Sequence, residues 1–369
     1  MAMEFLDNQG TDGDLAGSQV RDRPTAKPQK KTLLVTGSTG FIGAHVTREL
    51  LDEGYYVYTI VRDKNKFTKL FGEKCHNLAI LEGDLLTNAS LEKLKQDIAS
   101  IGDDFDAVVH MVGGGPLTSN SKFTSAIFDL NYQTTCNLVR LLETTHKLDS
   151  LALFVYFSSL AAMGTPRSHG NTIVYRETTS CEPVLPYERA KLRTENFLSE
   201  VTNKHNFKTV VFRFPQVYGG EDDQFAQMIR LIRKGVFPVV RNKVGTLPLL
   251  HVQNAVKATC MVLGNVGLIQ GNYDVNLISE KSYSYDHLSE LVKQKYGTGG
   301  IVKLPYSLLY LATLMTENVF KVFGKPEPLN RRRLISMTKD RVVDCGKFSE
   351  TFGFQYDHSL PAFMSDHLR

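Results

Sequence analysis

The stretch Thr36-Gly-Ser-Thr-Gly-Phe-Ile-Gly43 decides the fold. It joins a β-branched run, Thr32–Thr36, to a segment of helical period, Phe41–Glu53. In such a junction the first glycine permits a tight turn, the second lets the backbone approach a pyrophosphate, and the third allows close packing of helix on strand. The N–H groups at the helix N-terminus then favour phosphate, whereas a glycine-rich turn without a ligand is the weaker alternative. The residues predicted to bind a dinucleotide here are Gly37, Thr39, Gly40, Phe41, Ile42 and Gly43.

Strand-like and helix-like segments alternate from Lys31 to Phe212. The predicted strands are Thr32–Thr36, Tyr56–Val61, Leu78–Leu81, Ala107–Met111, Leu151–Phe157 and Thr209–Phe212. The predicted helices are Phe41–Glu53, Lys122–His146 and Tyr187–Lys204. Such alternation predicts parallel strands joined by right-handed crossovers, which is an α/β fold with a doubly wound parallel Rossmann sheet.

The second half of the chain has a different rhythm, with longer loops and several prolines after Phe212. It predicts a smaller C-terminal substrate-binding domain over the carboxyl edge of the sheet, where ligands bind in open α/β folds. We expect a nucleotide-binding domain at 31–215, with a return segment at about 249–276, and a cap formed by 216–248 and 277–369. Residues 1–30 are polar and aperiodic, which predicts a disordered leader.

Composition excludes several classes of protein. Of the 369 residues, 42% are hydrophobic and 22% charged, and the net charge of +4 is too small to indicate nucleic-acid binding. The five cysteines are scattered without a C-x-x-C, so we expect no metal site and a reducing, cytoplasmic location. No apolar run is long enough to span a membrane. The basic run Arg331–Arg333 is interpreted as a solvated helix start, in preference to an anion or membrane contact.

The end of the second predicted strand bears on the choice of cofactor. It reads Val61-Arg62-Asp63, and valine cannot accept a hydrogen bond from the ribose 2′-hydroxyl of NAD. Arg62 offers a charged fork for a 2′-phosphate, so NADP(H) is predicted, with NAD(H) as the alternative in which Asp63 binds the ribose. Asp84, followed by Leu85, is predicted at the adenine rim, and a helix N-cap is an equal alternative for Asp84.

A catalytic group is predicted from Tyr187-Glu-Arg-Ala-Lys191. Residues four apart share a helical face, so the lysine is expected to lower the pKa of the tyrosine and let it transfer a proton. Ser158 and Ser159 follow a β-branched and aromatic strand, where a hydroxyl would donate to the same substrate oxygen. A serine pair that only caps the next segment is the alternative.

These motifs, in this order and spacing, resemble the extended short-chain dehydrogenase/reductase family, within the NAD-dependent epimerase/dehydratase superfamily. Val109–Val112, Asn131 and Arg213–Gly219 add to the likeness, which covers about Lys31 to Leu360. The resemblance implies that a serine, Tyr187 and Lys191 form the catalytic triad. It also implies that Pro215, Tyr187 and Lys191 contact the cofactor. In the family the catalytic serine usually lies four residues before the tyrosine of a V-Y-G motif. Ala162-Met-Gly164 stands at that place here, which selects Ser159, although methionine in place of the tyrosine departs from the family pattern.

The substrate class is predicted from two further segments. Leu249–Asn254 resembles the h-V-x-N of the 3β-hydroxysteroid dehydrogenase and dihydroflavonol-reductase-like branches, and Tyr306–Phe323 is apolar enough to line a pocket or to pack the cap. The leading hypothesis is hydride transfer between NADP(H) and a ketone or secondary alcohol of an apolar small molecule. The alternatives are a nucleotide-sugar epimerase or dehydratase with bound NAD, and a non-catalytic NAD(P)-sensing or scaffold protein. Peripheral membrane contact and a homodimer are left open.

Two loop and helix positions are left with two interpretations each. Gly113–Gly115 would bring backbone close to the nicotinamide or would only form a flexible loop. Asn131 would anchor a proton relay through water or would face a kink in its own helix.

Overall fold

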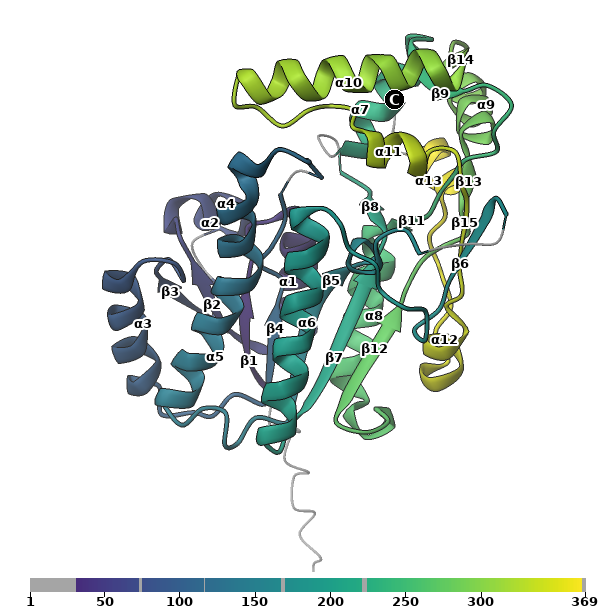
Figure 1. The fold of residues 1–369 in the computed structure, drawn as a ribbon. Helices are drawn as coiled ribbons and strands as arrows, with labels where there is room; N and C mark the ends of the chain where they lie inside the picture. The colour runs from purple at the N-terminus through teal and green to yellow at the C-terminus, as the bar shows by residue number, and fades with distance from the viewer. Residues whose placement is uncertain (1–30, 73–74, 116, 167–169, 221–223, 367–369) are drawn as a thin grey trace, which may run out of the picture. The chain divides into compact units, whose positions relative to one another are not determined.

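A seven-stranded sheet forms the centre of the protein, in the order β12-β7-β5-β4-β1-β2-β3 with every neighbouring pair parallel (Figure 1). Its strands are β1 (Thr32–Thr36), β2 (Tyr56–Val61), β3 (Leu78–Glu82), β4 (Ala107–His110), β5 (Leu153–Ser159), β7 (Lys208–Phe214) and β12 (Tyr273–Leu277). The predicted doubly wound parallel fold is therefore confirmed. The computed structural model describes residues 31–72, 75–115, 117–166, 170–220 and 224–366. The predicted disordered leader lies outside the described residues.

Both faces of this sheet are buried, because strand side chains alternate between them. Leu33 and Val35 pack into the cluster that α1 and α8 cover, whereas Leu34 packs into the cluster beneath α3, α5 and α6 (Figure 1). The helices of this part are α1 (Phe41–Asp52), α2 (Lys64–Phe71), α3 (Asn88–Ser100), α4 (Thr124–Phe128), α5 (Thr134–Thr144), α6 (Pro186–Lys204) and α8 (Val252–Gly264). The sequence prediction named neither α2 nor α3.

The long helix predicted at Lys122–His146 is wrong as one element. A 3-10 turn at Ser121–Phe123 and the short α4 lead into a π-helical turn at Asp129–Gln133, after which α5 begins. The Asn131 side chain lies in that turn and donates to the carbonyl of Ile127 (2.8 Å). Such a turn inserts one residue into the helix and is typical of functional sites.

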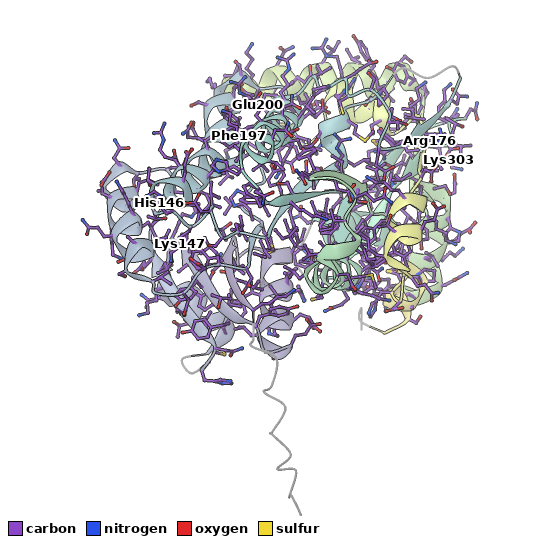
Figure 2. The ribbon with its side chains drawn as sticks, turned by 90° about the horizontal axis from the view of Figure 1, so that it is seen from below. His146, Lys147, Arg176, Phe197, Glu200 and Lys303 are labelled. Atoms are coloured by element: carbon purple, nitrogen blue, oxygen red, sulfur yellow. The ribbon has the colours of Figure 1, made fainter. Side chains whose placement is uncertain are left out.

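The C-terminal end of α5 is closed by two adjacent residues. His146 has φ 58°, in the left-handed region that stops a helix. Lys147 then turns back and donates to the carbonyl oxygens of Ile101 (2.9 Å) and Asp103 (2.8 Å). Figure 2 labels both side chains at this edge of the protein. These bonds fix the end of α5 to the loop that enters β4, at the end of the sheet where the parallel strands begin.

Smaller elements lie over the carboxyl end of the sheet (Figure 1). Four two-stranded pairs are formed by β6 (Thr172–Tyr175) with β15 (Asp340–Val343), β8 (Gln216–Tyr218) with β11 (Leu249–His251), β9 (Phe237–Val240) with β14 (Ile301–Leu304), and β10 (Thr246–Leu247) with β13 (Tyr283–Ser284). The helices here are α7 (Gln224–Arg233), α9 (Tyr285–Tyr296), α10 (Tyr306–Val322), α11 (Arg331–Ser336) and α13 (Leu360–Asp366). Helix α12 (Gly346–Phe352) lies beside β12 instead, and its Phe348 and Phe352 join the core that α1 and α8 cover (Figure 1).

This part has its own core, in which Phe225, Ile229 and Leu288 are buried together. The chain from Lys31 onward nevertheless forms one compact unit, so the predicted boundary between nucleotide-binding domain and cap stays a prediction. Among the described residues, no helix combines the length and the apolar character needed to cross a bilayer.

Candidate active site

The turn between β1 and α1 is shaped by its glycines. Gly37 has φ +82°, and a Cβ there would lie 2.7 Å from the carbonyl carbon of Met111. A Cβ on Gly43 would lie 2.0 Å from the Gly37 oxygen, so the helix could not pack so closely on the turn with any other residue. Gly40 is the N-cap of α1 and has no side chain to accept from the helix N–H groups. The shape of the turn is compatible with a pyrophosphate, and the binding of a dinucleotide by these residues stays a prediction.

Ser159 and Tyr187 come together at the end of β5. Ser159 is the last residue of that strand, and its hydroxyl accepts from the N–H of Ala161 (3.1 Å). Burial raises the pKa of Tyr187, and a side-chain hydrogen bond with Ser159 opposes that shift. The expected lowering of the tyrosine pKa by Lys191 is not found. The Lys191 Nζ instead donates to the carbonyl oxygen of Phe157 (2.9 Å) and to the Tyr156 hydroxyl (3.2 Å).

Lys191 is itself strongly perturbed. Only 3% of the residue is exposed, and burial lowers its pKa to about 7, although the charge of Glu195 acts in the opposite direction. Its ammonium also lies 4.8 Å from the centre of the Tyr156 ring. An amine poised near neutral pH, next to a tyrosine and a serine in a cavity, is typical of catalytic sites.

A buried ion pair supports the strand that carries the serines. Arg213 on β7 donates from Nη2 to Glu195 (2.6 Å) and from Nε to both carboxylate oxygens, and both side chains are almost fully buried. Ser158 donates its hydroxyl to the same carboxylate. Both serines lie on the cavity wall, but the Ser158 hydroxyl is engaged by Glu195, whereas Ser159 shares a hydrogen bond with Tyr187. The geometry thus favours Ser159, the serine that the sequence selected.

The glycine loop after β4 runs beside the lysine. A Cβ on Gly113, whose φ is +152°, would lie 2.6 Å from the Lys191 Nζ. Asn131 clamps the next residue from both sides, since its Nδ2 donates to the Gly114 carbonyl (2.7 Å) and its Oδ1 accepts from the Gly114 N–H (2.9 Å). Asn131 therefore holds the loop from its helix kink, and this bonding leaves less of the amide for the alternative water relay.

These groups line one cavity of about 650 Å³. Of the residues predicted to form the site, those on its wall are Gly37, Gly40, Phe41, Ile42, Gly43, Ser159, Tyr187, Lys191 and Pro215. Three arginines from the cap share the wall, namely Arg332, Arg333 and Arg341. The Arg332 Nε is buried without a hydrogen-bond acceptor in the described part of the chain and lies 3.8 Å from Glu188 Oε1. An unsatisfied guanidinium N–H on a cavity wall indicates an anionic ligand.

The sequence interpretation of the basic run is correct only for its first residue. Arg331 begins α11, is exposed and pairs with Glu317, whereas Arg332 and Arg333 face the cavity. Arg341 was missed altogether, because it is a lone arginine on β15. Its guanidinium donates to the Thr246 carbonyl (2.7 and 2.9 Å), a contact across 95 residues that no local pattern reveals.

The remaining predicted cofactor residues lie outside the cavity wall. Thr39 is half-buried in the turn, and Arg62 is exposed at the end of β2. Asp63 is the N-cap of α2 and accepts from the Lys66 N–H (3.0 Å). Asp84 accepts from the Leu86 N–H (2.9 Å) in a turn, and α3 is capped by another residue. Leu85 is buried in the core beneath α3 and α5.

The apolar segment Tyr306–Phe323 does not line the cavity. No residue of α10 is on its wall, and the apolar side chains of this helix are largely exposed instead. The prediction that this segment lines an apolar substrate pocket is therefore wrong. The apolar part of the cavity wall comes from other elements, with Phe41, Phe157 and Leu160 among its residues, and glycines, hydroxyls and the three arginines make up the rest. In addition, no group of three His, Cys, Asp or Glu side chains within the described ranges could hold a metal ion.

A comparison of the sequence with models of known protein families identifies the family of this chain. Residues 33–277 match the NAD dependent epimerase/dehydratase family. The chain belongs to that family. This confirms the predicted class, an enzyme of the extended short-chain dehydrogenase/reductase kind, while the nearer likeness to 3β-hydroxysteroid dehydrogenases is not specifically supported.

Several curated relatives are UDP-glucose 4-epimerases. UDP-glucose 4-epimerase 2 of Oryza sativa subsp. japonica is 25% identical over 69% of this chain and 65% of its own length. A UDP-glucose 4-epimerase of Schizosaccharomyces pombe is 29% identical over 46% of this chain and 47% of its own length. The chain thus matches about half to two thirds of the length of these relatives.

Solved structures show the same fold at low identity. UDP-glucose 4-epimerase of Thermotoga maritima, with UDP-glucose, has a TM-score of 0.67 and 18% identity, covering 90% of this chain and 96% of its own. UDP-glucuronic acid 4-epimerase of Bacillus cereus, in complex with UDP-glucuronic acid and NAD, has a TM-score of 0.67 and 19% identity with the same coverage.

The predicted reductase of an apolar ketone is therefore wrong. The two relatives described above are UDP-glucose 4-epimerases, and the apolar segment that suggested an apolar substrate lies away from the cavity. The alternative named at the outset, a nucleotide-sugar epimerase or dehydratase, agrees better with both findings.

Proposed function

We propose that this protein is a dinucleotide-dependent 4-epimerase of nucleotide sugars. One observation carries the proposal: the glycine turn, the Ser159–Tyr187–Lys191 group and three arginines share one cavity. The glycine turn fits the pyrophosphate of the dinucleotide. The arginines fit a second diphosphate, because their forked N–H groups bind phosphate oxygens with charge-assisted hydrogen bonds. Within the protein their partners include a carboxylate at 3.8 Å from Arg332 and backbone carbonyls of Pro328 and Thr246, and an apolar ketone would add no anion to these contacts.

The chemistry divides between the cofactor and the chain. A bound dinucleotide would supply reversible hydride transfer at the sugar carbon, so that inversion there would involve no net oxidation. Tyr187 takes the proton of the sugar hydroxyl as the hydride leaves and gives it back to the same oxygen. Ser159 donates a hydrogen bond to that oxygen. Lys191 holds the cofactor ribose and, when charged, stabilises the tyrosinate.

The test is conversion of UDP-hexoses by the purified full chain with added NAD or NADP, followed by NMR of the sugar. We expect the 4-epimer of at least one UDP-hexose to accumulate. Arg332→Ala should raise KM at least tenfold with a smaller effect on kcat, since one charge-assisted contact contributes about 1.5–3 kcal/mol. Arg189→Ala, an exposed arginine outside the cavity, is the matched control. Reduction of apolar ketones without any epimerisation would overturn the proposal, as would cofactor binding without turnover.

The cofactor preference is a separate proposal, for NADP(H). Arg62 is exposed at the end of β2, whereas Asp63, the acid that would bind a ribose 2′-hydroxyl, is engaged in capping α2. Titration of both reduced cofactors should show NADPH bound about tenfold more tightly, and Arg62→Ala should remove most of that difference. Equal affinities, or tighter NADH, would refute the role of Arg62 and leave the epimerase proposal standing.

A further inference from the structure

Helix α10 presents an apolar face to solvent. We call this the α10 outer face, and its residues are between 48% and 79% exposed: Leu308, Leu311, Met315, Val319, Val322 and Phe323. The first five recur every three or four residues, so they share one side of the helix. Single exposed apolar side chains are ordinary, but a contiguous set of this kind marks an interaction surface. Figure 1 shows α10 along the outer edge of the cap.

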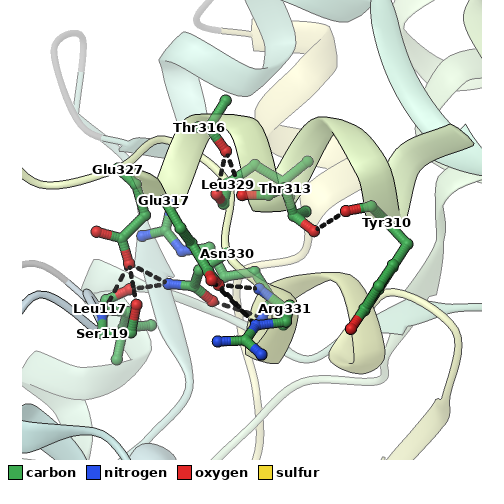
Figure 3. Close-up of polar contacts among 11 residues, drawn as sticks. Leu117, Ser119, Tyr310, Thr313, Thr316, Glu317, Glu327, Leu329, Asn330 and Arg331 are labelled. Carbon is green, nitrogen blue, oxygen red and sulfur yellow. Dashed lines mark hydrogen bonds and ion pairs between the residues drawn. The ribbon is translucent and has the colours of Figure 1, made fainter. Parts of the chain in front are cut away.

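The inner side of α10 combines polar bonds with one buried apolar contact, that of Leu309 with Val240 and Leu334. Thr316 donates to the Leu329 carbonyl (2.9 Å), and Thr313 donates within the helix (2.6 Å). Glu317 accepts from both the N–H (2.8 Å) and the guanidinium (3.0 Å) of Arg331 (Figure 3). These bonds between α10 and the start of α11 fix which side of the helix faces inward.

A second polar cluster ties this helical hairpin to the rest of the protein. The buried Glu327 carboxylate accepts from the Ser119 N–H (2.7 Å), from the Thr118 hydroxyl and from Asn330 (3.0 Å). Asn330 also donates to the Leu117 carbonyl (2.7 Å) (Figure 3). Residues 117–120 follow the glycine loop of the active site. The apolar face is therefore held outward by polar contacts to the protein on its other side.

The charges around this face are basic. Between residues 303 and 333 the sequence has six lysines and arginines against two acids, Glu317 and Glu327, and both acids are engaged in the contacts above. Of the cations, Arg331 pairs with Glu317, and Arg332 and Arg333 line the cavity, so the charge beside this face comes from lysines. Lys303, labelled in Figure 2, pairs with Asp286. Lys321 and Lys325 are exposed at the end of α10. Both therefore lie beside the most exposed apolar residues, where an anionic surface would meet them.

An aromatic side chain marks the C-terminal end of the face. Phe323 follows the last turn of α10 and is 73% exposed. Tyr306 and Tyr310 stack at the start of the helix, with ring centroids 6.0 Å apart, but they lie on the other side of it, because Tyr310 precedes Thr313 and Glu317 by three and seven residues. Phenylalanine and lysine beside aliphatic residues are side chains that a bilayer interface accommodates, with apolar parts in the acyl region and charged tips in the headgroups.

We propose that α10 docks the protein on an anionic lipid surface, with the helix in the plane of the interface. The apolar outer face enters the headgroup boundary, and Lys321 and Lys325 meet the anionic lipids. This proposal is independent of the reaction assigned to the cavity, because no residue of α10 lines that cavity.

The experiment is co-sedimentation of the full chain with vesicles of phosphatidylcholine alone or with 30% phosphatidylserine. We expect binding to the anionic vesicles that falls at high salt. Leu311→Glu/Val322→Glu should weaken it at least tenfold, because two exposed apolar side chains become like charges of the lipid. The matched control is Leu268→Glu/Val244→Glu, two residues that are 49% and 70% exposed outside α10, and it should bind as wild type. Lys321→Gln/Lys325→Gln should weaken binding about 25-fold, roughly fivefold for each lysine.

Three results would overturn the proposal. The first is no sedimentation with anionic vesicles, and the second is equal loss in the α10 variant and its control. The third is a concentration-dependent dimer, seen by sedimentation velocity, that Leu311→Glu/Val322→Glu dissociates without any vesicle binding. That result would assign the face to a second copy of the chain. Far-UV circular dichroism of each variant checks that it is folded.

Discussion

The buried Arg213–Glu195 pair gives a sharp test of how the active-site strand is supported. Replacing Arg213 with methionine removes three charge-assisted hydrogen bonds to the Glu195 carboxylate. The Glu195 side chain is 2% exposed, and the Ser158 hydroxyl would be its remaining donor among the described residues. Breaking one partner of a buried pair costs about 3–5 kcal/mol, because the other charge stays buried without compensation. We expect Arg213→Met to lower the free energy of unfolding by that amount.

The assay is equilibrium unfolding in urea, followed by far-UV circular dichroism because the chain contains no tryptophan. Arg213→Met/Glu195→Leu should recover most of the loss, since both charges are then replaced by apolar groups. The exposed Arg189→Met is the control and should change stability by about 0.5 kcal/mol or less. A loss under about 1 kcal/mol for Arg213→Met, or no recovery in the double variant, would refute this account of the pair.

Three further predictions concern the catalytic residues. Tyr187→Phe should lower turnover of the accepted UDP-hexose by about 10² or more, roughly 3 kcal/mol of barrier, while cofactor titration shows affinity nearly unchanged; turnover close to wild type would remove Tyr187 from its role. The Lys191 pKa of about 7 in the folded protein lies below its unfolded value, so the unfolded chain binds the extra proton and stability should rise between about pH 7 and pH 10. Unfolding measured across that range should lose this rise in Lys191→Met, and an identical slope in both proteins would contradict the shift. Gly113→Ala should destabilise by about 1–3 kcal/mol and reduce turnover, because the φ is strained and the new Cβ meets Lys191, whereas Gly102→Ala, which has open space, should do neither. Thermal unfolding and turnover of the two alanine variants decide the matter.

The central sheet was predictable because its signals are local. The strands Thr32–Thr36 and Tyr56–Val61 have the predicted bounds, since each is a β-branched run that ends at a turn. The prediction of a single helix at Lys122–His146 was wrong because the helical period gives no sign of tertiary hydrogen bonds. Here the Asn131 side chain donates to the backbone of another loop, and the helix is interrupted at that residue. Helical period shows that a segment is helical but gives no information on where a tertiary contact interrupts it.

The candidate site divides in the same way. Gly37–Gly43 and Tyr187–Lys191 could be identified because the spacing that shapes them lies within one turn or one helical face. The choice of Ser159 over Ser158 rested on a resemblance, and its physical reason, the bond from Ser158 to Glu195, is visible only in the structure.

By itself, then, the sequence determined the sheet, the phosphate-binding turn and the tyrosine–lysine pair, because each depends on residues a few positions apart. Tertiary structure alone decided which charged side chains face the cavity and which apolar surface, the α10 outer face, is exposed to solvent. Arg341 reaches the site from β15, held by a carbonyl 95 residues away, and Asp63 is engaged by a helix end. The exposed apolar residues of α10 face outward because polar bonds and the buried Leu309 occupy its inner side. Apolar composition does not say which face of a helix is buried; the partners available in the folded chain do.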